Sequence, residues 1–292
     1  MGRGDLSDQE WARLEPHLPT NVGRGWRWKS HRRVINGILF RQRTGIPWRD
    51  LPARFGKWKT VHDRHRRWSG DEPWEKILRA VQADADAAGR IDWSLVSVDS
   101  TSCRAHQHAA GARAEMPRIP GRAGQPVEHR ADEALGRSRG GLTCKIHLAG
   151  EGGRRPLAFL ITPGQWGDAP QMIPTLERIR VLRTSGGRPR TRPDHVGGDK
   201  AYSSRQNRRY LRRQIKHTIP ERIDQRANRQ RRGSAGGRPT GFDKAIYKHR
   251  NEVERTFNAL KCFRAVATRF DKRAYVFHGT VTVASLRLWL RS

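Results

Sequence analysis

The stretch IYKHRNEVERTFNALK, residues 246–261, contains two sets of side chains at helical spacing. Each residue advances an α-helix by about 100°, so the members of a set return to the same side. The helix is therefore predicted to bury one face and to turn the other toward a charged ligand, such as a metal ion with phosphates around it. The polar set consists of Tyr247, Arg250, Glu254 and Lys261, and the apolar set of Ile246, Val253, Phe257 and Leu260.

The composition favours a polyanionic partner. The 292 residues carry a formal net charge of +31, with 59 Lys and Arg against 28 Asp and Glu. Cations that neutralise phosphates release condensed counterions, so a surplus of this size drives salt-sensitive binding to nucleic acid. An Arg-rich composition without enzymatic purpose is the alternative, and the self-repulsion of so many cations weakens it.

The remaining composition indicates a globular protein of a reducing compartment. Ten Trp and a hydrophobic fraction of 35% are enough for a core. The cysteines Cys103, Cys144 and Cys262 lie far apart without the C-x-x-C spacing of zinc sites. No apolar run approaches the ~18 residues of a membrane span, and MGRGDLSDQE at the N-terminus lacks the apolar part of a signal peptide. We expect a soluble, cytoplasmic protein without a membrane partner.

Residues 1–88 are predicted to form a helical domain of their own. Helices are expected from the cap at Leu6 to Glu10 onward, at 32–43, at 48–54 and at the very basic 57–68. Such a series resembles a helix-turn-helix unit, whose last helix enters the major groove. A helical bundle with a solvated basic face is the alternative. The candidate DNA contacts in the last helix are Lys59, Arg64, Arg66 and Arg67.

Residues 89–292 change to strand periodicity and are predicted to form a mixed α/β domain. Two long stretches interrupt it, at 104–141 and at the basic 222–244. The second is expected to be disordered until it meets phosphates, or else to be a plain solvated linker. Strands are expected at 93–99, 142–149, 156–162, 195–198 and 216–220, and helices at 168–181, 203–214 and 246–261.

Three acids are candidates for one metal site. Asp99 and Asp199 each follow an apolar strand, and Glu254 arrives from the helix described first. Carboxylates brought together in this way repel one another unless cations lie between them. Oxygen ligands select hard ions, so Mg²⁺ is expected, with Mn²⁺ tolerated. Two such ions about 3.5 to 4 Å apart could activate a water or a 3′-hydroxyl and stabilise the leaving oxygen of a phosphodiester, which indicates phosphoryl transfer.

Other acids have more ordinary interpretations. Asp168 could be a fourth acid of the site, but its position before a helical pattern favours a helix N-cap. Glu252 lies about 200° around the helix from Glu254 and is predicted to be a surface acid.

The stretch after Asp99 and the turn at Trp166 are candidate DNA contacts. His106 and His108 with Cys103 do not complete a zinc site, and we prefer a DNA-contacting loop that includes Arg104 and His106. Trp166 lies in a turn where it could stack on an unpaired base, although core packing is the default for an aromatic residue.

The spacing Tyr247-x2-Arg250-x3-Glu254-x6-Lys261 resembles the signature of bacterial insertion-sequence transposases of the DDE class. The resemblance extends over nearly the whole chain, and no acidic position departs from it. The supporting strings are VDSTSCRAHQHAAGA at 98–112, GRSRGGLTCKIH at 136–147, TPGQWGDAPQ at 162–171 and GDKAY at 198–202.

This resemblance implies a ribonuclease H-like catalytic domain that cleaves and joins DNA strands at the terminal inverted repeats of a transposon. It implies that Asp99, Asp199 and Glu254 bind two metal ions, and that the remaining signature residues contact phosphates near the transposon end. Double-stranded DNA is then the partner, and because two ends must be held together, a homodimer or larger assembly on DNA is expected. A structure-selective nuclease of the same fold and a transposase-derived repressor remain the alternatives.

Overall fold

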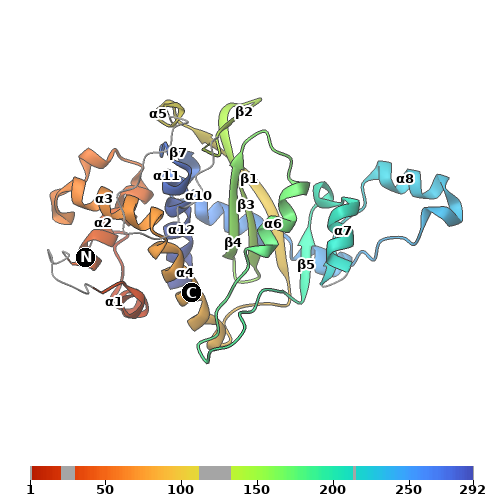
Figure 1. The fold of residues 1–292 in the computed structure, drawn as a ribbon, viewed down its shortest axis with the longest axis horizontal. Helices are drawn as coiled ribbons and strands as arrows, with labels where there is room; N and C mark the ends of the chain where they lie inside the picture. The colour runs from red at the N-terminus through yellow and green to blue at the C-terminus, as the bar shows by residue number, and fades with distance from the viewer. Residues whose placement is uncertain (1, 21–29, 112–132, 213–214, 292) are drawn as a thin grey trace.

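The computed structural model describes residues 2–20, 30–111, 133–212 and 215–291. Helices from the N-terminal part of the chain lie at one end, the sheet lies in the middle, and a basic segment projects at the other end (Figure 1). Within these ranges, no helix is both long and apolar enough to cross a membrane. Parts of the predicted loop 104–141 and helix 203–214 lie outside the described residues.

The N-terminal helices begin and end at signals in the sequence. Ser7 and Glu10 form a capping box, with each side chain accepting the other residue's backbone N–H, at 3.1 and 2.7 Å. Gly45, at φ 71°, ends the helix His31–Thr44 in the left-handed region. The helix predicted at 48–54 is instead two 3₁₀ turns, because Pro52 disfavours a helical residue before it. The helices are α1 (Asp8–Leu14), α2 (His31–Thr44), α3 (Trp58–Gly70) and the unpredicted α4 (Pro73–Ala87).

The sheet is mixed and follows the predicted strands closely. The strands are β1 (Val96–Ala105), β2 (Gly136–Ser138), β3 (Gly141–Glu151), β4 (Arg155–Pro163), β5 (His195–Gly198), β6 (Lys216–Thr218) and β7 (Thr268–Arg269). Pairing gives the order β4-β3-β1-β5-β6, and the short strands β2 and β7 pair with β3 and β1. Strand β3 is antiparallel to β4 and β1, and β1, β5 and β6 are parallel. This order and these directions are those of the ribonuclease H-like fold that the resemblance implies.

Strand β1 is longer than predicted, so Asp99 lies inside it rather than after it. The pairing of β1 with β5 nevertheless stops at Val98 and Gly198. Asp99 and Asp199 therefore each follow the last paired residue of two adjacent parallel strands. This is the place where side chains from distant parts of the chain can converge.

Helices cover both faces of the sheet. On one face, α10 (Asn251–Lys261) buries Val253 and Phe257 in one apolar cluster with Ile146 of β3. On the other, α6 (Met172–Glu177) buries Met172 with Val98 of β1. The remaining helices are α5 (Gln107–Ala110), α7 (Arg205–Arg212), α8 (Ile223–Arg231), α9 (Lys244–Lys248), α11 (Arg264–Ala267) and α12 (Ala274–Arg291).

The long C-terminal helix α12 joins the N-terminal helices to the sheet. It packs against α3 and α4, and its Leu286 and Trp289 belong to one buried cluster with Trp74 of α4 and Val98 of β1. The core of residues 1–88 is therefore continuous with that of the sheet.

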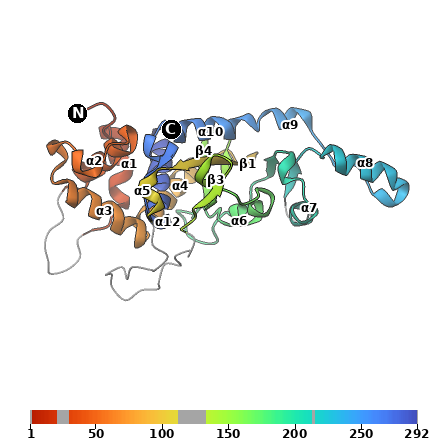
Figure 2. The same ribbon diagram turned by 90° about the horizontal axis from the view of Figure 1, so that it is seen from above.

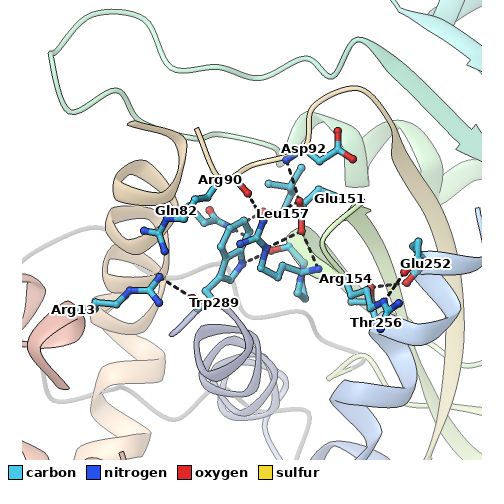
Figure 3. Close-up of polar contacts among 12 residues, drawn as sticks. Arg13, Gln82, Arg90, Asp92, Glu151, Arg154, Leu157, Glu252, Thr256 and Trp289 are labelled. Carbon is cyan, nitrogen blue, oxygen red and sulfur yellow. Dashed lines mark hydrogen bonds and ion pairs between the residues drawn. The ribbon is translucent and has the colours of Figure 1, made fainter. Parts of the chain in front are cut away.

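Polar contacts reinforce this junction (Figure 3). The Trp289 indole N–H donates to the Pro156 carbonyl at 2.8 Å, and Arg13 donates to the Trp289 carbonyl at 3.0 Å. Arg155 pairs with the buried Glu151 at 2.8 Å. The N-terminal helices, α12 and the β3–β4 turn are thus fixed to one another by paired buried groups.

The basic stretch 222–244 is not wholly irregular, contrary to the expectation of disorder. It contains α8, followed by a 3₁₀ turn at Gly233–Gly236. Arg229 pairs with Glu221 at 3.0 Å across the base of α8. No residue of α8 is buried, and the segment extends away from the sheet (Figures 1 and 2). Composition alone missed this helix because it lacks an apolar face.

Candidate active site

Asp99 and Asp199 lie together at the edge where β1 and β5 separate. Asp99 Oδ1 accepts the Ser100 backbone N–H at 2.8 Å, and Asp199 Oδ1 accepts that of Ala201 at 2.8 Å as the cap of a 3₁₀ turn. Burial raises the pKa of Asp99 above its usual value, and the negative charge of Asp199 raises it further, against the opposing Ser100 N–H and Arg250. The two carboxylates are therefore close enough to repel.

Arg250 lies between Asp99 and Glu254. Its Nη1 is 3.1 Å from Asp99 Oδ2, and its Nη2 is 2.6 Å from Glu254 Oε1. Glu254 is half-exposed, with 50% of its side chain accessible, whereas Asp99 is largely buried. All three predicted acids thus reach one region, and in this structure a side-chain cation bridges two of them.

The helix predicted at 246–261 is two helices, α9 and α10, with a tightened turn between them. His249 and Arg250 donate their backbone N–H groups to residues three positions back, and so does Val253. Such 3₁₀-type bonding keeps the chain running in nearly one direction, as Figure 2 shows. Arg250 is the N-cap of α10. The residue that contacts Asp99 and Glu254 therefore lies at the junction between α9 and α10.

The other signature residues lie on either side of this joint. The Tyr247 ring, on α9, is 5.9 Å from Arg250 Cζ and 5.1 Å from the Phe242 ring centroid. Lys261 is the last residue of α10. A hydrogen bond with Cys144 and burial raise the pKa of the nearby Cys103 thiol, and the charge of Lys261 only partly opposes that rise. Both Tyr247 and Lys261 are half-buried.

The donor set fits a hard divalent ion, although the conformation is not that of a closed metal site. Among the described residues, no group of three or more His, Cys, Asp or Glu is close enough to hold a metal. Asp99, Asp199 and Glu254 offer only carboxylate oxygens, the ligands that Mg²⁺ and Mn²⁺ prefer. Two of these carboxylates, Asp99 and Glu254, already contact a cationic group, the Arg250 guanidinium.

Asp168 occupies the N-cap position before the 3₁₀ helix Ala169–Gln171, as the sequence favours, but its side chain does not cap that helix. It makes no capping hydrogen bond; its Oδ1 accepts instead from Ser100 Oγ at 2.7 Å and from Lys145 Nζ at 2.9 Å. Local sequence favours a cap at this position, whereas both partners come from strands that are distant in sequence. Sequence reasoning missed Ser100 and Lys145, although both lie within the strings of the resemblance.

Tyr202 is a second residue that sequence reasoning missed. It is 1% exposed, and its hydroxyl lies near Ser100 without a hydrogen bond of standard geometry. Burial raises its pKa, and the charges of Asp99, Asp168 and Asp199 raise it further. A buried neutral phenol therefore lies among three carboxylates. Its place in the string GDKAY, three residues after Asp199, was the available signal.

The candidate DNA contacts of α3 do not share one environment. Lys59, Arg66 and Arg67 are exposed. Arg64, in contrast, is buried. Its Cζ lies 5.2 Å from the Trp68 ring centroid, and its Nη1 lies 3.1 Å from His31 Nδ1. Burial lowers the pKa of Arg64 to about 10. The structure thus places Arg64 in the packing of α3 rather than on its surface.

The remaining predicted contacts are dispersed. Arg104 is exposed near the end of β1. His106 stacks on Phe270 with ring centroids 4.6 Å apart. Trp166 is 38% exposed, so it is not a core residue. Glu252 pairs with Arg154 at 2.6 Å, so it is a partly covered acid and not a freely solvated one (Figure 3).

A basic groove lies beside β6, at the base of the projecting segment. Its volume is about 1450 Å³. Of the described residues that line it, Asp243 is the acid, and its carboxylate already caps α9 by accepting from Ala245 and Ile246. The groove therefore presents mainly positive charge. Its cationic lining residues are Arg205, Arg208, Arg212, Lys216, Arg238 and Lys244.

Several known proteins are similar to parts of this chain. A protein of Sinorhizobium fredii (strain NBRC 101917 / NGR234) named "Uncharacterized protein y4sN" is 37% identical over 118 residues, 39% of this chain and 89% of that protein. The "Insertion element IS402 uncharacterized 16.2 kDa protein" of Burkholderia cepacia is 35% identical, covering 44% of this chain and 88% of that protein. The "Putative transposase for insertion sequence element IS6501" of Brucella ovis is 30% identical, and the match covers 51% of this chain and 100% of that protein.

Family models divide the chain into two matched regions. Residues 6–78 match the family described as "Putative transposase of IS4/5 family", and residues 92–289 match "Transposase DDE domain". Among solved structures, the Mos1 transposase paired-end complex with the left transposon end aligns with 84% of this chain and 82% of that chain, at 11% identity and a TM-score of 0.24, too low to carry an inference. Because the DDE domain spans well over half of its length, the chain belongs to the DDE transposase family.

Proposed function

We propose that this chain is a DNA transposase that binds the terminal inverted repeats of its element and catalyses metal-dependent strand cleavage and strand transfer. One observation carries the proposal: Asp99 and Asp199 follow the last paired residues of two adjacent parallel strands, and Glu254 reaches Asp99 through a single bridging cation. An all-oxygen set of this kind suits phosphoryl transfer at a phosphodiester.

In this proposal the three acids hold the metal and their neighbours hold DNA. Two Mg²⁺ ions, or Mn²⁺ in their place, would neutralise charge on the attacking and leaving oxygens. Asp99, Asp199 and Glu254 would supply the ligands. Arg250 would then be available to bind a phosphate of the transposon end through its guanidinium. Tyr247 and Lys261, on either side, contact the same backbone.

Duplex DNA would follow the basic surfaces. Residues 1–88 would find the end, with Lys59, Arg66 and Arg67 of α3 exposed for phosphates. Residues 89–292 would carry out the chemistry, with the groove beside β6 as a second positive surface. Because two ends must be joined together, we propose a homodimer or larger assembly on DNA, acting in the cytoplasm where the nucleoid lies.

A strand-transfer assay tests the proposal against its alternatives. The substrate is an end-labelled duplex taken from the DNA that borders the reading frame, incubated with Mg²⁺ and a target plasmid. A transposase gives joined products. Nicked products without joining would indicate a structure-selective nuclease, and a mobility shift without any cutting would indicate a repressor.

A further inference from the structure

A polar cluster lies behind Asp99, on the opposite face of the sheet. Ser100 pairs with His147 across the β1–β3 ladder, and Ser102 pairs with Lys145, whereas Asp99 pairs with Leu148. Paired residues share a face and successive residues alternate, so Ser100, His147 and Lys145 point away from the face that α10 covers. Asp168 meets them there, and we call Ser100, Lys145, His147 and Asp168 the Asp168 cluster.

Ser100 links this cluster directly to Asp99. Its backbone N–H donates to Asp99 Oδ1 at 2.8 Å, while its hydroxyl donates to Asp168 Oδ1 at 2.7 Å. The same Asp168 oxygen accepts from Lys145 Nζ at 2.9 Å, and Lys145 also donates to the Trp166 carbonyl at 2.9 Å. The carboxylate of Asp168 is therefore fixed by two donors, one of which belongs to the residue that orients Asp99.

The contact between Ser100 and Asp168 lies where β1 has no paired strand on one of its two edges. Pairing with β5 ends at Val98, and pairing with β7 begins only at Arg104. Across the ranges that the structure describes, no strand pairs with residues 99–103 on that side. At Ser100, the hydrogen bond to Asp168 supplies a constraint that a neighbouring strand supplies elsewhere.

We propose that Asp168 is a positioning residue for Asp99. It holds Ser100, and through the Ser100 N–H it fixes one oxygen of the Asp99 carboxylate, so that the other oxygen is oriented toward Arg250. Lys145 keeps Asp168 in place and balances its charge, so that the site gains a rigid support without a fourth metal ligand. This inference rests on the proposed function, because it requires Asp99 to bind a metal.

The test measures Mn²⁺ binding to the full-length protein by electron paramagnetic resonance, which does not depend on a DNA substrate. Asp168→Asn should weaken Mn²⁺ binding by about tenfold, the usual cost of losing a residue that orients a metal ligand. Ser100→Ala should do the same, and Ser100→Thr, which keeps the hydroxyl, should restore binding. Asp224→Asn, on the exposed face of α8, is the matched loss of one carboxylate and should leave binding unchanged.

A double mutant and a stability control distinguish positioning from folding. Because Ser100 and Asp168 act in series, the double variant should bind Mn²⁺ no more weakly than either single variant. Thermal midpoints should not track the losses of affinity.

Wild-type affinity in Asp168→Asn or Ser100→Ala would overturn the inference, as would losses that parallel the fall in thermal midpoint. Asp99→Asn serves as the reference: if it binds Mn²⁺ like the wild type, then the proposed function itself fails, which is a separate result.

Discussion

At the scale of single residues, the position of Arg250 has the most direct consequence for function. Its guanidinium contacts Asp99 and Glu254 at 3.1 and 2.6 Å. A metal ion and this guanidinium would therefore compete for the same carboxylates. We infer that metal binding releases Arg250, which then becomes available to a phosphate beside the scissile bond.

Replacement of Arg250 separates its contact with the carboxylates from its proposed contact with a phosphate. Arg250→Ala should weaken binding to end DNA and lower the salt slope of binding by about one unit, since one phosphate contact is lost. Without the competing guanidinium, Mn²⁺ binding should not weaken. The control is Arg255→Ala, because Arg255 lies on the same helix but pairs with Glu252. A salt slope equal to that of the wild type would show that Arg250 supports the fold and contacts no phosphate.

Buried histidines predict a loss of stability in acid. Burial lowers the pKa of His65 and of His147 to about 4. Between about pH 6.5 and pH 4 the unfolded chain binds protons at these sites and the folded chain does not, so the free energy of unfolding falls as pH falls. Each histidine contributes a slope of up to about 1.4 kcal/mol per pH unit in that window.

Urea unfolding at several pH values measures this slope. His65→Gln keeps a donor toward the Thr280 hydroxyl, which His65 Nε2 approaches at 3.1 Å, but it removes the titrating ring. In this variant the free energy of unfolding should depend less steeply on pH, and the difference should equal the contribution of one histidine. If its slope matches that of the wild type across the window, then His65 does not titrate as its burial indicates.

At the scale of elements, the apolar face of α10 packs on the sheet and so fixes the position of Glu254. Phe257 is 6% exposed and lies in a cluster with Ile146 of β3. Phe257→Ala should lower the free energy of unfolding by about 3 to 5 kcal/mol, from lost burial and the cavity that remains. Urea unfolding measures this, with Arg255→Ala on the exposed side as the control. A loss below about 1 kcal/mol would mean that α10 is not anchored as described.

The sequence predicts most elements, and the exceptions have physical causes. The strands that lead to Asp99 and Asp199 are predictable because apolar runs bounded by polar residues are a local signal. The joint at His249 and Arg250 has no such signal, because 3₁₀ and α bonding admit the same residues. The sequence favours a cap at Asp168 because capping is a local pattern, whereas the partners of its side chain come from β1 and β3 and depend on tertiary structure.

At the scale of the whole molecule, the N-terminal helices and the sheet share a core. Trp289 of α12, fully buried, lies in one cluster with Trp74 of α4 and Val98 of β1. We therefore predict that the chain unfolds as one cooperative unit. Tryptophan fluorescence and far-ultraviolet circular dichroism should give coincident transitions in urea. Two separated transitions, with the N-terminal helices unfolding first, would show that the junction is weaker than its packing indicates.

The net charge of +31 acts on the whole molecule as well. It should make DNA binding fall steeply with salt, because each neutralised phosphate releases counterions. Charge alone brings DNA to the protein but cuts nothing. In the proposed function, cleavage would depend on the carboxylates of Asp99 and Asp199 where β1 and β5 separate.

The most direct measurement compares wild type and Asp99→Asn on one duplex that carries the terminal repeat bordering the reading frame, in Mg²⁺. Binding is measured without metal, and cleavage is then followed on the labelled strand. We predict that both proteins bind the duplex with the same affinity, that the wild type cuts and joins it, and that Asp99→Asn does neither. Cleavage by Asp99→Asn at the wild-type rate would contradict the role of Asp99 as a metal-binding catalytic residue.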